Sequence, residues 1–311
     1  MKQVKTKKSN RIGLKSDRLF YCLILLFPVL QFCVFYIGVN ANSFALAFQD
    51  ITQDSATLQY HTSWSLQAFK DAFELLKTPL MLNIIKTSFL AYFILTAVNV
   101  PVGLLFSYYI AKNFSGSRFF RVILFLPSIL SSIVMATLYN YFFEQAVPAI
   151  VGDITGADSV LPLMARGDKM LFVMIMLYNL WIGFGVNVLM YANSMSGISP
   201  DILDAAKIDG ATGIKEFWYV TLPLVFPTIS VFLITGVAGI FTNQLNLFSF
   251  YGGRSDLGVQ TFGYYLYRMT QASGKQQYPM LAAFGLMMTA VAVPLTFLVK
   301  YLLERFGPSE D

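Results

Sequence analysis

The composition of this 311-residue chain excludes an ordinary soluble protein. Hydrophobic residues make up 56% of the chain and charged residues only 13%, whereas soluble proteins are about one quarter charged. One His and two Cys exclude a zinc or iron–sulfur site built within the chain, and no P-loop motif occurs. The composition therefore predicts an integral membrane protein.

The net charge of +5 is concentrated at the start of the chain. Seven of the 22 Lys and Arg residues lie in the first 18 positions, directly before the first apolar run. Such an arm is typical of a membrane topology signal that meets anionic lipid headgroups. We predict a basic cytoplasmic arm over 1–18, contact with membrane lipid and no nucleic-acid partner.

Six apolar segments have the length of a membrane-spanning helix, which is about 20 residues. They cover residues 19–39, 82–111, 119–143, 170–192, 222–247 and 280–303. Each segment is predicted to be a helix, because backbone polar groups in hydrocarbon must be hydrogen-bonded internally. The predicted fold is an all-α membrane protein with six transmembrane helices, a transmembrane domain over 19–303 and a cytoplasmic tail over 304–311.

The loops between these segments differ in their content of Lys and Arg, which predicts orientation. With the N-terminus inside, the inner connections carry fourteen such residues and the outer loops seven. Both termini are therefore predicted to be cytoplasmic. The first apolar run is longer than the 7–15 residues of a signal peptide, so it is predicted to be an uncleaved anchor although Ala-Leu-Ala at 45–47 resembles a cleavage site.

The first outer loop is long and ends in an amphipathic pattern. Apolar residues recur at helical spacing between Trp64 and Leu80, with charged residues between them. We predict a helix that lies at the membrane interface. A structural lid is favoured over a ligand site for this helix.

The connection between the fourth and fifth apolar segments has its own helical pattern. Ser199 followed by Pro200 is typical of a helix start, and Gly210 is typical of a helix end because Gly accepts positive φ. A second helical stretch is predicted over 212–220. The pattern alone fits a docking element for a partner and an amphipathic helix resting on headgroups equally well.

Three parts of this connection carry a resemblance to a known motif. The Asp-Ala-Ala run at 204–206, Gly210 and the Val-Thr-Leu-Pro run at 220–223 have the spacing of the EAA loop of binding-protein-dependent ABC importer permeases. The Ile-Asp-Gly-Ala run at 208–211 resembles the carbohydrate branch of that family. Asp stands at 204 where the family has Glu, and Val stands at 220 where it has Ile.

Weaker similarities extend the resemblance beyond this loop. The Trp-Ile-Gly-Phe-Gly run at 181–185 is similar to a family pattern in the fourth helix, and the residues from Phe120 to Pro127 are similar to its entry to the third. The segment 66–83 resembles the lead-in to the second helix. The likeness therefore spans most of 19–303.

The resemblance implies a coupling-helix pair over 199–223 that is seated in a groove of a cytoplasmic ABC ATPase dimer. It also implies a second homologous permease subunit, an extracellular sugar-binding protein, a carbohydrate substrate and a bacterial plasma-membrane location. ATP and Mg would be bound by the partner ATPase, so no cofactor is expected in this chain. The implied coupling residues are Asp204, Ala205, Ala206, Asp209, Gly210, Leu222 and Pro223.

Polar residues at the end of the fifth apolar segment are candidates for the substrate pathway. Carboxamides in hydrocarbon cost free energy unless they are bonded, so they face protein or a water-filled cavity. Amides and aromatic rings suit the hydroxyls and the apolar face of a sugar, while hydrogen bonding with helices of the partner permease explains the amides equally well. The candidates are Asn243, Gln244, Asn246, Phe248, Tyr251 and, in the fourth segment, Asn187.

The predicted function is a non-catalytic permease subunit of an ATP-driven importer for a carbohydrate, with an oligosaccharide favoured. The alternative is a self-sufficient, ion-coupled secondary transporter, for which the EAA spacing would be a coincidence. A proton-coupled carrier is disfavoured because the apolar segments hold almost no Asp, Glu or His. A membrane enzyme is a more distant alternative, since the single His, His61, lies in an outer loop.

Overall fold

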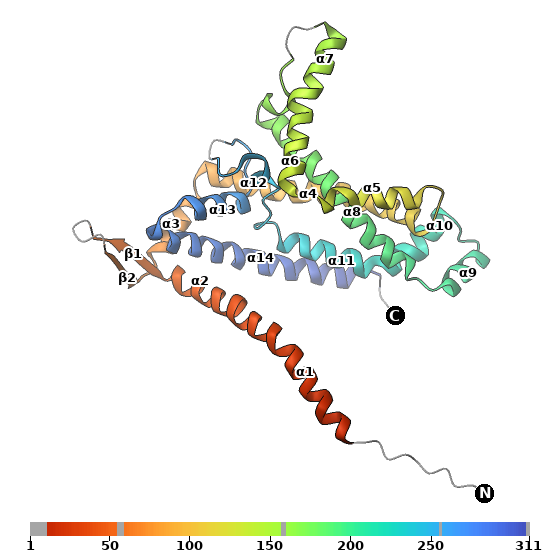
Figure 1. Cartoon of the computed structure of the whole chain (residues 1–311), viewed down its shortest axis with the longest axis horizontal. Coiled ribbons are helices and arrows are strands. Elements are labelled where there is room, and N and C mark those ends of the chain that lie inside the picture. The colour runs from red at the N-terminus through yellow and green to blue at the C-terminus, as the bar shows by residue number, and fades with distance from the viewer. Residues whose placement is uncertain (1–10, 55–58, 157–159, 255–256, 309–311) are drawn as a thin grey trace. The chain divides into compact units, whose positions relative to one another are not determined.

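The computed structural model describes residues 11–54, 59–156, 160–254 and 257–308, with the backbone alone for 11–18. The described chain is mostly helical (Figure 1). It divides into two compact units, of which the first comprises Met1–Ala72 and Lys275–Leu286 and the second comprises Phe73–Gly274 and Met287–Asp311. Four lysines of the predicted basic arm, in the first ten positions, lie outside the described residues.

The first unit begins with a long helical segment. Helix α1, Arg11–Gln31, continues through a π-helical turn, η1 (Phe32–Gly38), into α2, Val39–Ala47. The most apolar stretch of 18 residues between Leu19 and Ala47 has a mean hydropathy of 2.4. The helix therefore starts before and ends after the predicted segment 19–39.

A β-hairpin follows this helix, and the prediction of an all-α chain is wrong at this point. Strands β1, Gln49–Gln53, and β2, Tyr60–Trp64, pair antiparallel with Gln49 opposite Trp64. The strands contain β-branched and aromatic residues, which favour extended backbone. Residues 55–58, between the two strands, lie outside the described part of the chain.

The predicted amphipathic segment at 64–80 contains a helix, α3, Gln67–Leu76. Thr78 then caps the next helix, α4, Pro79–Ala111, by accepting a hydrogen bond from the backbone N–H of Met81. Pro79 takes the first helical position, where its missing N–H costs nothing. The location of α3 at a membrane interface stays a prediction.

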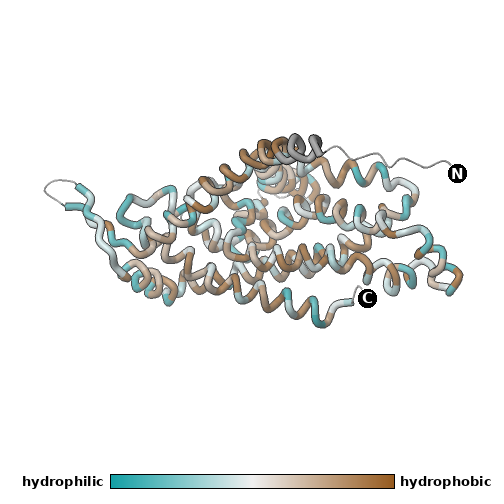
Figure 2. The backbone as a smooth tube through the Cα atoms, turned by 90° about the horizontal axis from the view of Figure 1, so that it is seen from below, coloured by the Kyte–Doolittle hydropathy of each residue, from teal (hydrophilic) through white to brown (hydrophobic). Residues whose placement is uncertain are grey.

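Among the described residues, five helices are long and apolar enough to cross a membrane, or six if one bent pair forms a single span. The long helices are largely brown in Figure 2, which marks hydrophobic residues. The spans are Leu19–Ala47, Pro79–Ala111, Asp168–Ser196, Ile214–Ala238 and Lys275–Phe306. The last contains the short turn η5, Lys275–Gln277, and helix α14, Tyr278–Phe306, and the third is helix α8.

The bent pair replaces the single helix predicted over 119–143. Helix α5, Ser117–Ile129, ends shortly after Pro127, and α6, Ser132–Tyr141, starts in a new direction (Figure 1). The bend between the two halves is 102°. Proline removes one helical hydrogen bond, and the following residues, Leu130 and Ser131, adopt extended ψ values of 153° and 134°. Helix α6 continues through η2, Phe142–Ala146, into α7, Val147–Thr155.

The fifth predicted segment, 222–247, also ends early. Helix α11, Leu222–Ala238, stops at Gly239, and turns follow until α12, Leu247–Tyr251. Leu245 and Asn246 adopt positive φ values of 50° and 55°, a conformation that no helix continues through. The short turn η3, Leu163–Ala165, and helices α9, Pro200–Ile208, and α13, Phe262–Ala272, complete the elements of the second unit.

Helix α8 packs closely against its neighbours in the second unit. The hydroxyl of Ser107 on α4 donates a hydrogen bond of 2.8 Å to the carbonyl of Val188 on α8. One turn away on α8, a Cβ added at Gly185 would lie 1.7 Å from the carbonyl oxygen of Leu124 on α5. Only glycine permits this approach between the backbones of α5 and α8. Small residues serve close helix contact in membrane proteins generally.

We predict that Gly185→Ala destabilises the chain by about 1–3 kcal/mol or more, because the new methyl group overlaps a backbone atom that cannot move alone. The matched control is Gly183→Ala on the same helix, where an added Cβ meets nothing within 4 Å. The control should be neutral or slightly stabilising, since Ala favours a helix by about 1 kcal/mol over Gly. Thermal unfolding of both variants in detergent measures the difference, and equal midpoints would refute the close contact.

Candidate functional site

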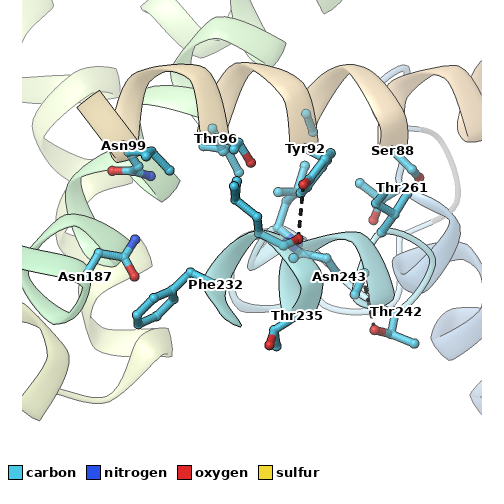
Figure 3. Close-up of a pocket in the computed structure, with 18 of the residues that line it drawn as sticks. Ser88, Tyr92, Thr96, Asn99, Asn187, Phe232, Thr235, Thr242, Asn243 and Thr261 are labelled. Atoms are coloured by element: carbon cyan, nitrogen blue, oxygen red, sulfur yellow. Dashed lines mark hydrogen bonds between the residues drawn. The ribbon is translucent and has the colours of Figure 1, made fainter. Parts of the chain in front are cut away.

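A polar cavity of about 460 Å³ lies between helices α4, α8 and α11 and the turns after α11 (Figure 3). Its size falls within the range of about 300–1,000 Å³ that is typical of small-molecule sites. Hydroxyls and carboxamides supply its polar groups. The polar residues that line it are Ser88, Tyr92, Thr96, Asn99, Asn187, Tyr191, Thr235, Thr242, Asn243 and Thr261.

The lining of the cavity contains no charged residue among those described. It therefore suits an uncharged ligand that both donates and accepts hydrogen bonds. The rings of Tyr92, Tyr191 and Phe232 add apolar surface. This mixture of amides, hydroxyls and rings fits a polyol with one apolar face.

Asn99 is the most informative of these residues. It is 9% exposed, and its Oδ1 atom has no hydrogen-bond partner among the described residues. A buried polar atom without a partner costs about 1–3 kcal/mol, so it indicates a water or ligand position. Figure 3 shows the side chains of Asn99 and Asn187 on facing sides of the cavity.

The structure brings two of the six substrate-pathway candidates into this cavity, Asn187 and Asn243. The Oδ1 atom of Asn243 also accepts a hydrogen bond of 2.8 Å from the backbone N–H of Leu245, which stabilises the turn after α11. The other four candidates are not part of the lining. These are Gln244, Asn246, Phe248 and Tyr251.

Asn246 instead forms a hydrogen-bonded link between the turn and α8. Its Nδ2 atom donates to Oδ1 of Asn179 at 2.9 Å, and Nδ2 of Asn179 donates to the carbonyl of Leu245 at 3.0 Å. This link lies within the chain, whereas the alternative offered by the sequence, hydrogen bonding of these amides with a partner permease, stays a prediction. Of the two aromatic candidates, Tyr251 packs against the core of the unit, whereas Phe248 is 38% exposed and lies edge-on to Tyr267.

Sequence reasoning missed the cavity residues of α4, although a signal for them exists. Ser88, Tyr92, Thr96 and Asn99 follow one another at intervals of four, four and three residues. This spacing places them on one face of a helix. A polar stripe on an otherwise apolar span is therefore the pattern that would have identified α4 as a wall of the cavity.

The second candidate site is the segment 199–223, called here the candidate docking segment. Its helix α9 starts as predicted, because Ser199 Oγ accepts a hydrogen bond from the backbone N–H of Asp201 at 3.3 Å. Helix α9 ends at Asp209, and Gly210 follows with φ of +79°. The sequence-based prediction of a capped helix and a glycine turn is confirmed.

The second half of the candidate docking segment differs from the prediction. Helix α10, Ile214–Glu216, runs through a π-helical turn, η4 (Phe217–Thr221), into α11, so Ile214–Ala238 forms one span. Leu222 and Pro223 therefore lie inside a continuous helix and do not open a new one. Proline is accommodated there because the π-helical turn before it alters the hydrogen-bonding pattern.

The alanines of the segment do not share an outward face. Ala205 is exposed, whereas Ala206 is 7% exposed and packs within the unit. Asp204 is also exposed, and its carboxylate accepts a hydrogen bond from Lys207 Nζ at 2.8 Å. This hydrogen bond raises the pKa of Lys207. Ala205 and Asp204 are thus free to meet a partner, and Ala206 is not.

Phe217 anchors the segment to the membrane helices. Its side chain is 2% exposed and packs in a cluster with Leu104 and Tyr191. The hydroxyl of Tyr108 on α4 donates a hydrogen bond of 3.0 Å to the carbonyl of Gly213. The next residue, Trp218, is 56% exposed.

A buried ion pair lies beside this anchor. Lys112 Nζ lies 2.5 Å from Oε1 of Glu216, and the two side chains are 25% and 4% exposed. Lys112 caps the C-terminal end of α4 and Glu216 lies in the first turn of α10, which are the helix ends that favour each charge. Removing one partner of such a pair costs about 3–5 kcal/mol.

The fold and the polar cavity define a multi-pass membrane permease, and comparison with known proteins identifies its family. The chain belongs to the family described as binding-protein-dependent transport system inner membrane component, whose model matches residues 99–309. Members of this family are non-catalytic transport subunits, so the chain is a permease subunit of the bacterial plasma membrane.

Named relatives of this chain include sugar transport permeases. The arabinooligosaccharides transport system permease protein AraP of Halalkalibacterium halodurans is 27% identical over 322 aligned positions, which cover 99% of this chain and 96% of AraP. The multiple sugar-binding transport system permease protein MsmF of Streptococcus mutans is 25% identical over 182 residues, 58% of this chain and 61% of MsmF. The match thus spans about three fifths of MsmF.

A solved structure shares the fold. A chain from the crystal structure of a bacterial ABC transporter involved in the import of the acidic polysaccharide alginate superposes with a TM-score of 0.70. The sequences are 19% identical, and the match covers 96% of this chain and 99% of that one. At this identity the likeness concerns the fold alone.

We predict that Asn179→Leu destabilises the permease by about 1–3 kcal/mol, because it leaves the Asn246 amide and the Leu245 carbonyl unpaired. The matched control is Asn187→Leu, the same change two turns along α8 at a residue that lines the cavity. The control should shift the thermal midpoint in detergent much less. A loss as large for Asn187 as for Asn179 would contradict the division into packing and cavity residues.

Proposed function

We propose that this chain is the transmembrane permease subunit of an ATP-driven ABC importer for a carbohydrate, with an oligosaccharide as the favoured substrate. The observation that carries the proposal is the uncharged cavity with the unpaired Oδ1 atom of Asn99 in its wall. The names of relatives such as AraP and MsmF support the substrate class.

Sugar hydroxyls match the chemistry of this cavity. Each hydroxyl donates one hydrogen bond and accepts others, as the carboxamides of Asn99, Asn187 and Asn243 also do. The rings beside them pack on the apolar face of a sugar ring. An acidic polysaccharide would instead require cations in the wall, and the described lining has none.

The ATPase is proposed to bind the candidate docking segment. Ile208 is 86% exposed and Ile202 is 44% exposed on α9, and a partner groove would remove this apolar surface from water. Ala205 between them permits close approach, and Asp204 offers a charge. Asp209 and Gly210 set the turn, and Leu222 and Pro223 belong to the helix that carries the movement into the membrane.

The remaining assembly follows from the same proposal. A second homologous permease completes the pathway, an extracellular binding protein delivers the sugar, and the ATPase dimer binds ATP and Mg. The loop excess of Lys and Arg supports cytoplasmic termini, with the arm at 1–18, the transmembrane domain at 19–303 and the tail at 304–311. The alternative, an ion-coupled secondary transporter, has no observation in its favour.

The substrate proposal predicts that Asn99→Leu abolishes stimulation of ATP hydrolysis by the transported sugar. The complete importer is reconstituted in nanodiscs, and a panel of di- to pentasaccharides is tested with its binding protein. We expect the stimulation at a given sugar concentration to fall at least tenfold. A lost hydrogen bond to the sugar costs about 1–3 kcal/mol of binding free energy, and each step of about 1.4 kcal/mol is a tenfold change in affinity. Asn40→Leu, the same change on the exposed helix α2, is the control.

Wild-type stimulation in Asn99→Leu would show that the sugar does not use this cavity. Loss of stimulation in Asn40→Leu as well would show that the assay reports general damage to the complex.

The docking proposal predicts that Ala205→Trp releases the ATPase while the permease stays folded in the membrane. The indole would occupy the space that the partner needs, and the residue is exposed, so the permease itself accommodates it. Ala205→Ser is the control and should retain the ATPase. Co-purification of the ATPase with each variant in mild detergent measures the effect, and full recovery with Ala205→Trp would refute docking at this face.

A further inference from the structure

The Lys112–Glu216 pair lies between the two candidate sites. Glu216 belongs to the helical span Ile214–Ala238, which connects the candidate docking segment to the cavity wall at Thr235. Lys112 ends α4, which supplies the opposite wall including Asn99. From Lys112 to Asn99 the helix rises about 20 Å at 1.5 Å per residue. The pair thus connects the ends of the two helices that enclose the cavity.

Among the described residues, two polar contacts join α4 to the candidate docking segment at this junction, the Lys112–Glu216 pair and the hydrogen bond from Tyr108 to Gly213. A second cavity of about 290 Å³ beside it is lined by both charges of the pair and by Asp204 and Lys207. Lys207 forms an ion pair with the exposed Asp204, and Lys112 forms the ion pair with Glu216. Lys112 Nζ also lies 5.5 Å from the centre of the Tyr108 ring, whose hydroxyl bonds Gly213.

We propose that Lys112 and Glu216 are positioning residues that transmit movement of the candidate docking segment to α4, so that both walls of the cavity move together. The proposal rests on the proposed function, because it requires the ATPase to move that segment. The ion pair holds Lys112 Nζ 2.5 Å from Oε1 of Glu216 and so fixes the distance between the two helix ends. Apolar packing by Phe217 at the same junction is non-directional and allows the helix ends to slide.

Replacing both charges by apolar side chains distinguishes a role in transmitting movement from a role in stability alone. Lys112→Met together with Glu216→Leu removes both charges, and well-packed apolar side chains often replace a buried ion pair without loss of stability. We expect this double variant to accumulate and bind the ATPase like wild type. We also expect its helix ends to move independently, so that ATP hydrolysis no longer moves α4.

The test uses the complete importer with spin labels at Ser115→Cys, just after α4, and at Tyr219→Cys, one turn beyond Glu216. Both sites are exposed, and Cys22 and Cys33 are first changed to Ala. Electron paramagnetic resonance measures the distance between the labels without nucleotide and with ATP plus vanadate. For the native pair we expect one narrow distribution of label-to-label distances in both states. For the apolar double variant we expect the width of that distribution to increase at least twofold with nucleotide.

The charge reversal Lys112→Glu with Glu216→Lys provides the rescue. It restores an ion pair at the same place. We expect it to reverse at least half of the broadening of the distance distribution that the apolar double variant shows with nucleotide, whereas Lys112→Glu alone should not. If the distance distribution of the apolar double variant is as narrow as that of wild type in both states, the proposal is overturned and the pair is a structural contact. Broadening in the native pair would overturn it too. Absence of any ATPase from the wild-type complex would instead refute the proposed function.

Discussion

A polar side chain inside hydrocarbon costs free energy unless it is bonded, and this constraint separates two kinds of polar residue in the permease. Asn179 and Asn246 bond each other and hold the turn after α11 against α8. Ser107 bonds the backbone of α8 in the same way. Asn99 has an unpaired oxygen that faces a cavity. The paired groups stabilise the fold, and the unpaired oxygen of Asn99 lies in the cavity where we propose that a sugar binds.

The same constraint governs the charges. Lys112 and Glu216 are buried only because each neutralises the other at favourable helix ends. Their position joins the candidate docking segment to the cavity walls through continuous helix. In the importer that we propose, ATP is hydrolysed on a different chain from the one that carries the sugar, so coupling requires a connection of this kind.

The sequence predicted local features better than distant ones. The capped start of α9 and the turn at Gly210 depend on adjacent residues, and both are confirmed. The break at Leu130 was missed because Pro127 is compatible with a kinked helix as well as a broken one. The Lys112–Glu216 pair joins residues far apart in sequence, so no local pattern reveals it. Asn246 was open to both interpretations, because amide chemistry alone does not name its partner.

The most direct test of the account is the energy source of uptake. Proteoliposomes that contain the complete importer, and others that contain this chain alone, are supplied with labelled oligosaccharides and either ATP or an imposed ion gradient. The account predicts uptake only in the complete importer and only with ATP. Ion-driven uptake by this chain alone would contradict it.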